Sequence, residues 1–212
     1  MKKRLIVLFF LLVPIASALF YSCICPPCPR QQFRVFTHKS LSLINLDNSG
    51  ARPVESESLQ LNKNAFGIRL YLEGEVISAA THRARGGSLL IQSAYAISCG
   101  CPPAFTYTAN ENILSIRIFT MNDFDSQHPA NSDITDLFRV GRSFSTVESF
   151  VANRRDSFEG DVEFEFWQEH ELTIDLLLMF PPTANNKHQF EVQVALSDGR
   201  VLKQQTIEIE LI

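Results

Sequence analysis

Alternation of apolar and polar residues at every second position is the feature that most constrains this fold. The alternation is strict in Phe66–Glu73, and it is also present in Phe190–Leu196 and in Thr206–Leu211. A period of two places one set of side chains on a buried face and the other set in solvent, which is typical of β-strands in a half-buried sheet. The chain is therefore expected to be all-β.

Shorter apolar runs predict further strands. They lie at Phe33–Leu46, Ser88–Ile97, Phe105–Thr108, Ile113–Thr120, Phe164–Phe166 and Leu172–Phe180. We expect the strands at 105–108 and 113–120 to pair around the loop 109–112, and residues 51–63 to form a polar loop. The clearest hairpin joins His188–Leu196 to Val201–Leu211, because Asp198-Gly199 is a preferred pair for a tight turn.

One short helix is predicted within this β-rich pattern. Ser145-Thr146-Val147-Glu148 has the form of a capping box, and Val147, Phe150 and Val151 follow at helical spacing. Residues 133–138 are expected to form a single helical turn. Seven to nine short strands with one helix predict a single immunoglobulin-like β-sandwich, which we place at residues 33–212.

The N-terminus has the pattern of an export signal. Met1-Lys2-Lys3-Arg4 is positively charged and precedes the apolar run Leu5–Val13. The stretch from Leu5 to Phe20 has only 16 residues, whereas a membrane-spanning helix needs about 20. A permanent transmembrane anchor is therefore disfavoured.

Two cleavage sites compete. Ala16-Ser17-Ala18 fits ordinary signal peptidase and would release a soluble secreted chain. Ser22-Cys23 instead resembles a lipobox, in which Cys23 receives the lipid after cleavage behind Ser22. Lipidation of one of the five cysteines leaves an even number for pairing. This parity favours a lipoprotein signal peptide at 1–22 and a cysteine- and proline-rich tether at 23–32, with the membrane contacted through the lipid anchor.

The other four cysteines are Cys25, Cys28, Cys99 and Cys101. In an exported protein they are expected to form disulfides, and bridges between the tether and the 99–101 turn would close long loops. A four-thiolate zinc or copper site is an alternative. A redox pair at Cys25 and Cys28 is a further one, although the two prolines between them disfavour it.

Charge excludes one function class. The net charge is −4, and removal of residues 1–22 leaves 16 basic and 23 acidic residues, a net charge of −7. Proteins that bind nucleic acids through phosphate neutralisation are usually basic, so no nucleic-acid partner is expected.

No catalytic motif is apparent, and no cofactor is expected. The five histidines are scattered, and none lies in a His-x-x-x-His or Gly-x-Ser-x-Gly setting. Asp123, Asp125 and Asp133 form a weak candidate calcium site, but the EF-hand spacing fails and such residues often shape turns. Thr81–Gly87 is a small basic loop that could meet an anion, and a plain surface loop is the simpler interpretation.

Several segments carry a resemblance to a known family. They are Ser22-Cys23, Ser98-Cys99, the stretch 122–130 with Asp136-Leu137-Phe138, and Leu196-Ser197-Asp198-Gly199. Together they resemble an uncharacterised lipoprotein family of Bacteroidetes, a domain of unknown function. This resemblance implies a cell-envelope address and no chemistry. Ile24–Phe36 contains no acidic residue, which favours an outer-membrane lipoprotein facing the periplasm.

The expected function is that of a non-catalytic envelope lipoprotein. Anchored through Cys23, it would present its sandwich to an envelope protein or a glycan. Three alternatives stay open: a metal-handling lipoprotein that uses the four remaining cysteines, a soluble protein cleaved after Ala18, and a hydrolase whose site the sequence does not reveal.

Overall fold

The computed structural model describes residues 32–81, 105–141, 144–156 and 171–212, and most of them lie in β-strands. The predicted signal peptide, nearly all of the tether and the predicted strands at 88–97 and 164–166 lie outside these ranges. Within the described ranges, no helix is both long and apolar enough to cross a membrane. The sandwich belongs to one compact unit, residues 34–79 and 106–212.

The elements follow one another in an order dominated by strands. The strands are β1 (Gln32–Asp47), β2 (Val54–Glu55), β3 (Gln60–Leu61), β4 (Phe66–Thr81), β5 (Phe105–Ala109), β6 (Ile113–Thr120), β7 (Phe138–Val140), β8 (Ser145–Thr146), β9 (Glu171–Leu178), β10 (Lys187–His188), β11 (Phe190–Leu196), β12 (Val201–Gln205) and β13 (Ile209–Leu211). The helical elements are the 3₁₀ turns η1 (Lys63–Ala65) and η2 (Thr135–Leu137) and the α-helix α2 (Val147–Asp156).

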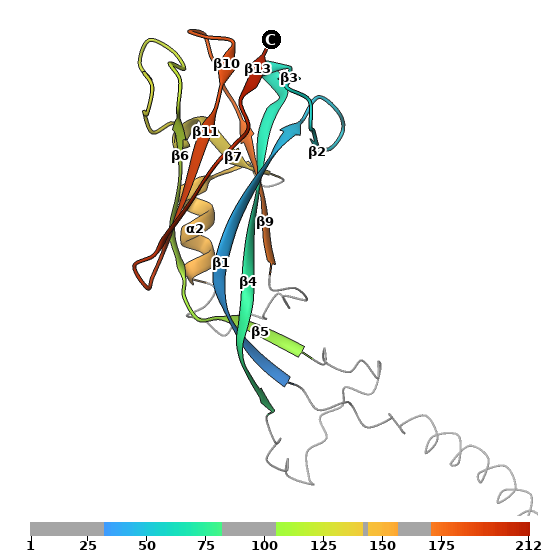
Figure 1. Cartoon of the computed structure of the whole chain (residues 1–212), viewed down its shortest axis with the longest axis vertical. Helices are drawn as coiled ribbons and strands as arrows, with labels where there is room; N and C mark the ends of the chain where they lie inside the picture. Colours follow the sequence, from blue (N-terminus) through green and yellow to red (C-terminus); the bar gives the residue numbers. More distant parts are fainter. Residues whose placement is uncertain (1–31, 82–104, 142–143, 157–170) are drawn as a thin grey trace, which may run out of the picture. The chain divides into compact units, whose positions relative to one another are not determined.

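These strands build one seven-stranded sheet and two three-stranded sheets (Figure 1). The large sheet has the order β2-β1-β4-β9-β7-β8, and β5 also pairs with β1. The smaller sheets have the orders β12-β11-β6 and β10-β13-β3. The sheets pack together around one apolar core. The prediction of an all-β sandwich with one short helix is confirmed.

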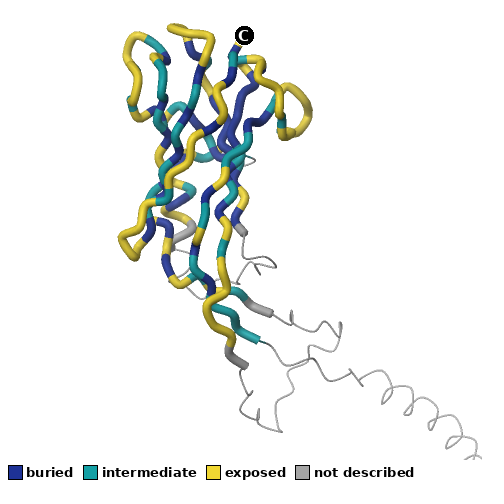
Figure 2. Tube along the Cα trace, in the orientation of Figure 1, coloured by how far each residue is buried: buried dark blue, intermediate teal, exposed yellow. Residues whose placement is uncertain are grey.

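The alternation seen in the sequence becomes the inner face of the sheets. On β4 and β9, Ile68 lies opposite Leu176 and Leu70 lies opposite Ile174, and all four side chains are buried. Figure 2 shows the buried positions along the strands, whereas exposed positions fill the loops at their ends and also follow β12 and the later part of β4. Burial of this apolar surface is the main favourable contribution to folding, roughly 25 cal/mol per Å².

Phe190 on β11 joins the sheets across the core. Its ring stacks on that of Phe66 of β4, with centroids 5.3 Å apart, and meets the ring of Phe138 of β7 edge-on at 6.1 Å. All three side chains are completely buried. Aromatic pairs in these geometries add to the stabilisation that burial alone supplies.

The predicted helix exists and begins where expected. Val147 and Val151 are buried and Phe150 is half-buried, as their spacing predicts. The hydroxyl of Thr146 accepts a hydrogen bond from the backbone N–H of Ser149 at 3.1 Å. Thr146 therefore caps the helix, one residue later than the predicted capping box placed the cap.

One pairing prediction was wrong. The strands β5 and β6 do not form a hairpin, because β5 pairs with β1 whereas β6 pairs with β11. The predicted polar loop 51–63 also contains the short strands β2 and β3, and β3 pairs in parallel with β13. Alternation predicts which face of the sheet a side chain lies on, but it does not predict which strand pairs with which.

The hairpin of β11 and β12 forms as predicted, around Asp198 and Gly199, and Gly199 takes a φ of +90° that favours glycine. Its second arm ends before the predicted Leu211. The buried hydroxyl of Thr206 accepts a hydrogen bond from the N–H of Phe190 at 3.1 Å. Thr206 thus takes over the pairing at this end of β11, and the chain continues into β13, which pairs with β10.

Arg200, in the same turn, ties the small sheet to the large one. One terminal guanidinium nitrogen, Nη2, donates to the carboxylate of Glu111 at 2.7 Å and to the hydroxyl of Thr37 at 2.8 Å. The other terminal nitrogen, Nη1, donates to the backbone carbonyl of His38 at 2.7 Å. The Glu111 side chain is only 1% exposed. Its oxygen Oε1 also accepts from Thr37 Oγ1 and from the backbone N–H of His38. The guanidinium therefore compensates a buried charge.

We expect Arg200→Gln to destabilise the fold by about 1–3 kcal/mol, because the buried Glu111 carboxylate would lose the partly exposed cation that donates to it. Arg117→Gln is the matched control. Its ion pair with Asp133 is largely exposed, so its loss should cost less than about 1 kcal/mol. Chemical denaturation measures both. Equal effects of the two variants would show that the Glu111 pair does not hold the sheets.

The completely buried His188 makes stability depend on pH. Its Nε2–H donates to the carbonyl of Asn185 at 2.7 Å, and its ring stacks on Phe190. Burial lowers the pKa of His188 below the ordinary value of 6.5, and the hydrogen bond to Asn185 opposes this only in part. His188 therefore binds a proton more weakly in the folded protein than in the unfolded chain.

We expect His188 to contribute its full share to the free energy of unfolding above about pH 6.5. This contribution should be lost as the pH falls from there toward the pKa of His188 in the folded protein. The unfolded state binds more protons in this window, so stability rises with pH across it. Denaturation of the protein and of His188→Gln between about pH 7.5 and 5 tests this. An identical pH slope in the variant would contradict the assignment to His188.

Candidate functional site

The cysteines predicted to carry lipid, disulfides or metal lie outside the described residues. They are Cys23, Cys25, Cys28, Cys99 and Cys101. The basic loop 81–87 lies outside as well, except for Thr81 at the end of β4. These assignments stay predictions.

The acidic loop 121–136 is described, and its carboxylates bind their own backbone. Asp123 accepts from the N–H of Ala130 at 2.9 Å, and Asp133 accepts from the N–H of Thr135 at 3.0 Å. Each carboxylate closes a local turn. Within the described part of the chain, no three acidic, histidine or cysteine residues are grouped as metal ligands, so Asp123, Asp125 and Asp133 are not brought together.

Asp125 and His128 form the closest acid–base pair in this loop. Asp125 Oδ1 accepts from the N–H groups of Gln127 and His128 at 2.8 Å and from His128 Nδ1 at 2.9 Å. Partial burial raises the pKa of Asp125, but these hydrogen bonds outweigh it and hold the pKa below the ordinary value. The Nδ1 hydrogen faces the carboxylate, so the neutral ring carries its lone pair on Nε2.

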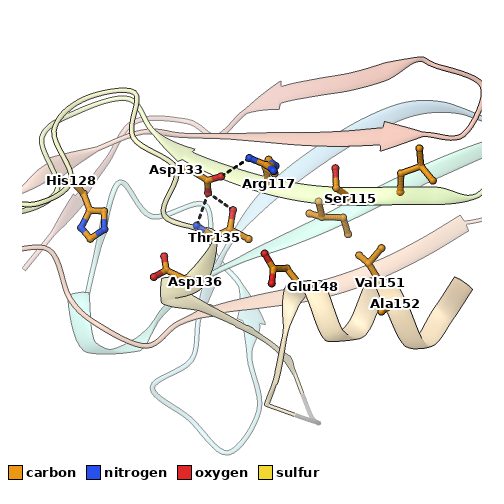
Figure 3. A pocket seen from close by; sticks show the side chains of 11 residues that line it. Ser115, Arg117, His128, Asp133, Thr135, Asp136, Glu148, Val151 and Ala152 are labelled. Carbon is orange, nitrogen blue, oxygen red and sulfur yellow. Dashed lines mark hydrogen bonds and ion pairs between the residues drawn. The ribbon is translucent and has the colours of Figure 1, made fainter. Parts of the chain in front are cut away.

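A groove of about 580 Å³ lies between β6, this loop and α2 (Figure 3). Its apolar lining includes Leu114, Val151 and Ala152. The carboxylates of Asp136 and Glu148 lie on the helix side, and neither makes a hydrogen bond or an ion pair in the described structure. Glu148 is in the first turn of α2, where the helix dipole also favours a negative charge.

Among its described residues, the groove shows no nucleophile paired with a base. Figure 3 shows His128 at one end and Ser115 toward the other, with Arg117 and Thr135 between them. The hydroxyl of Thr135 is already engaged with Asp133 at 2.5 Å. Nucleophilic catalysis needs the hydroxyl within hydrogen-bonding reach of its base, and neither described hydroxyl of the groove has this relation to His128.

A second hollow, of about 500 Å³, lies on the outer face of the large sheet. We call it the outer-face hollow; it is lined by Asn48, Ala51, Arg52, Pro53, Arg69, Gly141, Phe144, Asp175 and Leu177. Arg69 on β4 and Asp175 on β9 lie directly opposite each other. They face outward because their neighbours Ile68 and Leu176 face the core.

The Arg69 guanidinium is held in place on both sides. Its Nε and one terminal nitrogen donate to the two oxygens of Asp175 at 2.6 and 2.9 Å, and the other terminal nitrogen donates to Glu55 at 2.8 Å. Tyr71 also donates to Glu55. The pairing with Asp175, aided by Glu55, raises the pKa of Arg69 above its ordinary value. The charge of Arg69 is thereby compensated.

Arg52 and Phe144 complete the wall of this hollow. Arg52 is exposed and has no ion pair within the described ranges. The Phe144 side chain is 61% exposed, and its backbone has a φ of +48°. The sequence analysis missed these residues, because neither the pairing of Arg69 with Asp175 nor a positive φ at Phe144 has a signal in the pattern.

The geometry defines an all-β sandwich domain with two open surface hollows and no described metal or catalytic centre. Residues 38–207 match the family model of DUF5034, a domain of unknown function. The chain belongs to this family. No curated protein and no solved structure matches the chain significantly. The family match confirms the resemblance at the level of a domain of unknown function, whereas the Bacteroidetes and lipoprotein parts stay predictions.

From the hydrogen bonds of the carboxylates in the acidic loop, we predict that calcium does not stabilise the protein. Asp123, Asp125 and Asp133 already accept hydrogen bonds from their own turns, and a cation would have to displace them. We expect the same melting temperature with chelator and with millimolar calcium. A calcium-dependent rise that Asp125→Asn abolishes would contradict this geometry.

Proposed function

We propose that the chain is a lipid-anchored envelope protein whose sandwich binds a ligand without transforming it. The observation that carries the proposal is the pair of surface hollows. Each combines an apolar lining with charged groups that have no partner in the described structure: Asp136 and Glu148 in one, Arg52 in the other. Hollows of 300–1,000 Å³ with a few polar groups are typical of ligand sites.

The remaining polar groups support binding over catalysis. The Asp125–His128 pair is the closest to a catalytic dyad, and Figure 3 places Ser115 away from His128 in the groove that His128 lines. Arg69 and Asp175 neutralise each other. A carboxylate–histidine pair activates a nucleophile only when a hydroxyl or thiol lies within hydrogen-bonding reach of the free ring nitrogen, and none of the groups labelled in Figure 3 lies so near to His128.

The anchor is supported by the sequence around Cys23. A small residue, Ser22, precedes the cysteine, and a positively charged and apolar leader precedes both. Transfer of a diacylglyceryl group to the Cys23 thiol and of a further acyl chain to its freed amine would bind the chain stably to a membrane, since two or more chains are required. The lack of acidic residues in Ile24–Phe36 supports an outer-membrane location facing the periplasm.

We expect the mature protein to fractionate with membranes and to have the intact mass of a chain that begins at a triacylated Cys23. Cys23→Ala should release the protein from the membrane, whereas Cys25→Ala should stay lipidated. A mature chain that begins at an unmodified Leu19 would refute the anchor. Zinc or copper in protein purified without chelator would instead favour the metal-handling alternative.

A further inference from the structure

The outer-face hollow has a combination of groups that a plain surface does not need. We propose that it binds a sugar ring that carries a carboxylate, with Phe144 as the stacking platform, Arg52 as the partner of the carboxylate and Asn48 as a partner of the ring hydroxyls. This inference rests on the proposed role of the domain as a binding module and names the class of its ligand. It is independent of the lipid anchor.

Phe144 supplies the first argument. A bulky residue at a φ of +48° is a genuine conformational outlier. Burial does not compensate for this strain, because 61% of the side chain is exposed. Among the described phenylalanines, only Phe144 and Phe180 are exposed. A strained, exposed aromatic ring at the edge of a hollow can present its face to the C–H groups of a sugar.

The charge of the hollow supplies the second argument. Glu55 and Asp175 both pair with Arg69, whereas the guanidinium of Arg52 has no ion pair within the described ranges and is the cation of the lining that can still bind an anion. A guanidinium fits a carboxylate with two parallel hydrogen bonds. The hollow therefore selects an anionic group at the Arg52 side.

Asn48, which also lines the hollow, suits sugar hydroxyls. The backbone N–H of Asn48 donates to the carbonyl of Ala65 at 2.7 Å, which fixes this end of the loop. The amide side chain of Asn48 makes no hydrogen bond in the described structure, and it offers both a donor and an acceptor. Sugar hydroxyls need both. The side chain of a bound peptide would instead need an apolar pocket deeper than one exposed ring.

The test uses the full chain and a matched pair of ligands, methyl glucuronide and methyl glucoside, which differ only at C6, where the first has a carboxylate and the second a hydroxymethyl group. We expect saturable binding of the glucuronide by NMR titration, and weaker binding of the glucoside. Phe144→Gly should weaken binding about five- to tenfold, the scale of one aromatic contact, and should leave the melting temperature nearly unchanged because it also relieves the strain. Arg52→Gln should remove the preference for the glucuronide.

Phe180→Ala is the control, because Phe180 is 60% exposed and does not line the hollow. It should bind the glucuronide as the unaltered protein does. The proposal is overturned if neither sugar binds, if Phe144→Gly binds as well as the unaltered protein, or if N-acetyl-phenylalaninate binds in preference to the glucuronide. None of these results bears on the mass of the mature N-terminus, so the anchor and the sugar site are tested separately.

Discussion

The contact of Phe190 with Phe66 and Phe138 is the interaction on which the rest of the sandwich depends. Phe190 begins β11, the central strand of its sheet, while Phe66 and Phe138 begin strands of the large sheet. Their rings fix the spacing of the two layers at one end of the core. The ring of His188 stacks on Phe190 and meets the ring of Phe124 edge-on, so the same cluster also holds the acidic loop that contains Phe124.

The sequence predicts the faces of this fold well and its pairings poorly. Alternation predicts Phe66, Leu70, Val192 and Val194 in the core, and all are completely buried. The Asp198-Gly199 turn fixed one hairpin because both arms are local. The partners of β5, β3 and β13 are distant in sequence, and side-chain period carries no information about which distant strand completes a sheet.

The candidate sites also differ in how far the sequence predicts them. The acidic loop was visible in the sequence because its residues are contiguous, yet only coordinates reveal that Asp123 and Asp133 close their own turns. The outer-face hollow was invisible, since Arg69 and Asp175 meet only through the register of β4 with β9. The conformation of Phe144 is likewise a property of the folded chain and has no marker in its residue type.

The late position of Phe190 in the chain has a consequence for the order of folding. Phe66 emerges first during synthesis, but its stacking partner follows more than a hundred residues later, and Gln60 meets Glu210 across a separation of 150 residues. Such long-range closure makes folding slow. The growing chain has no complete core until β11 is made. While the second half is being synthesised, the first half is therefore an incomplete domain with exposed apolar strands.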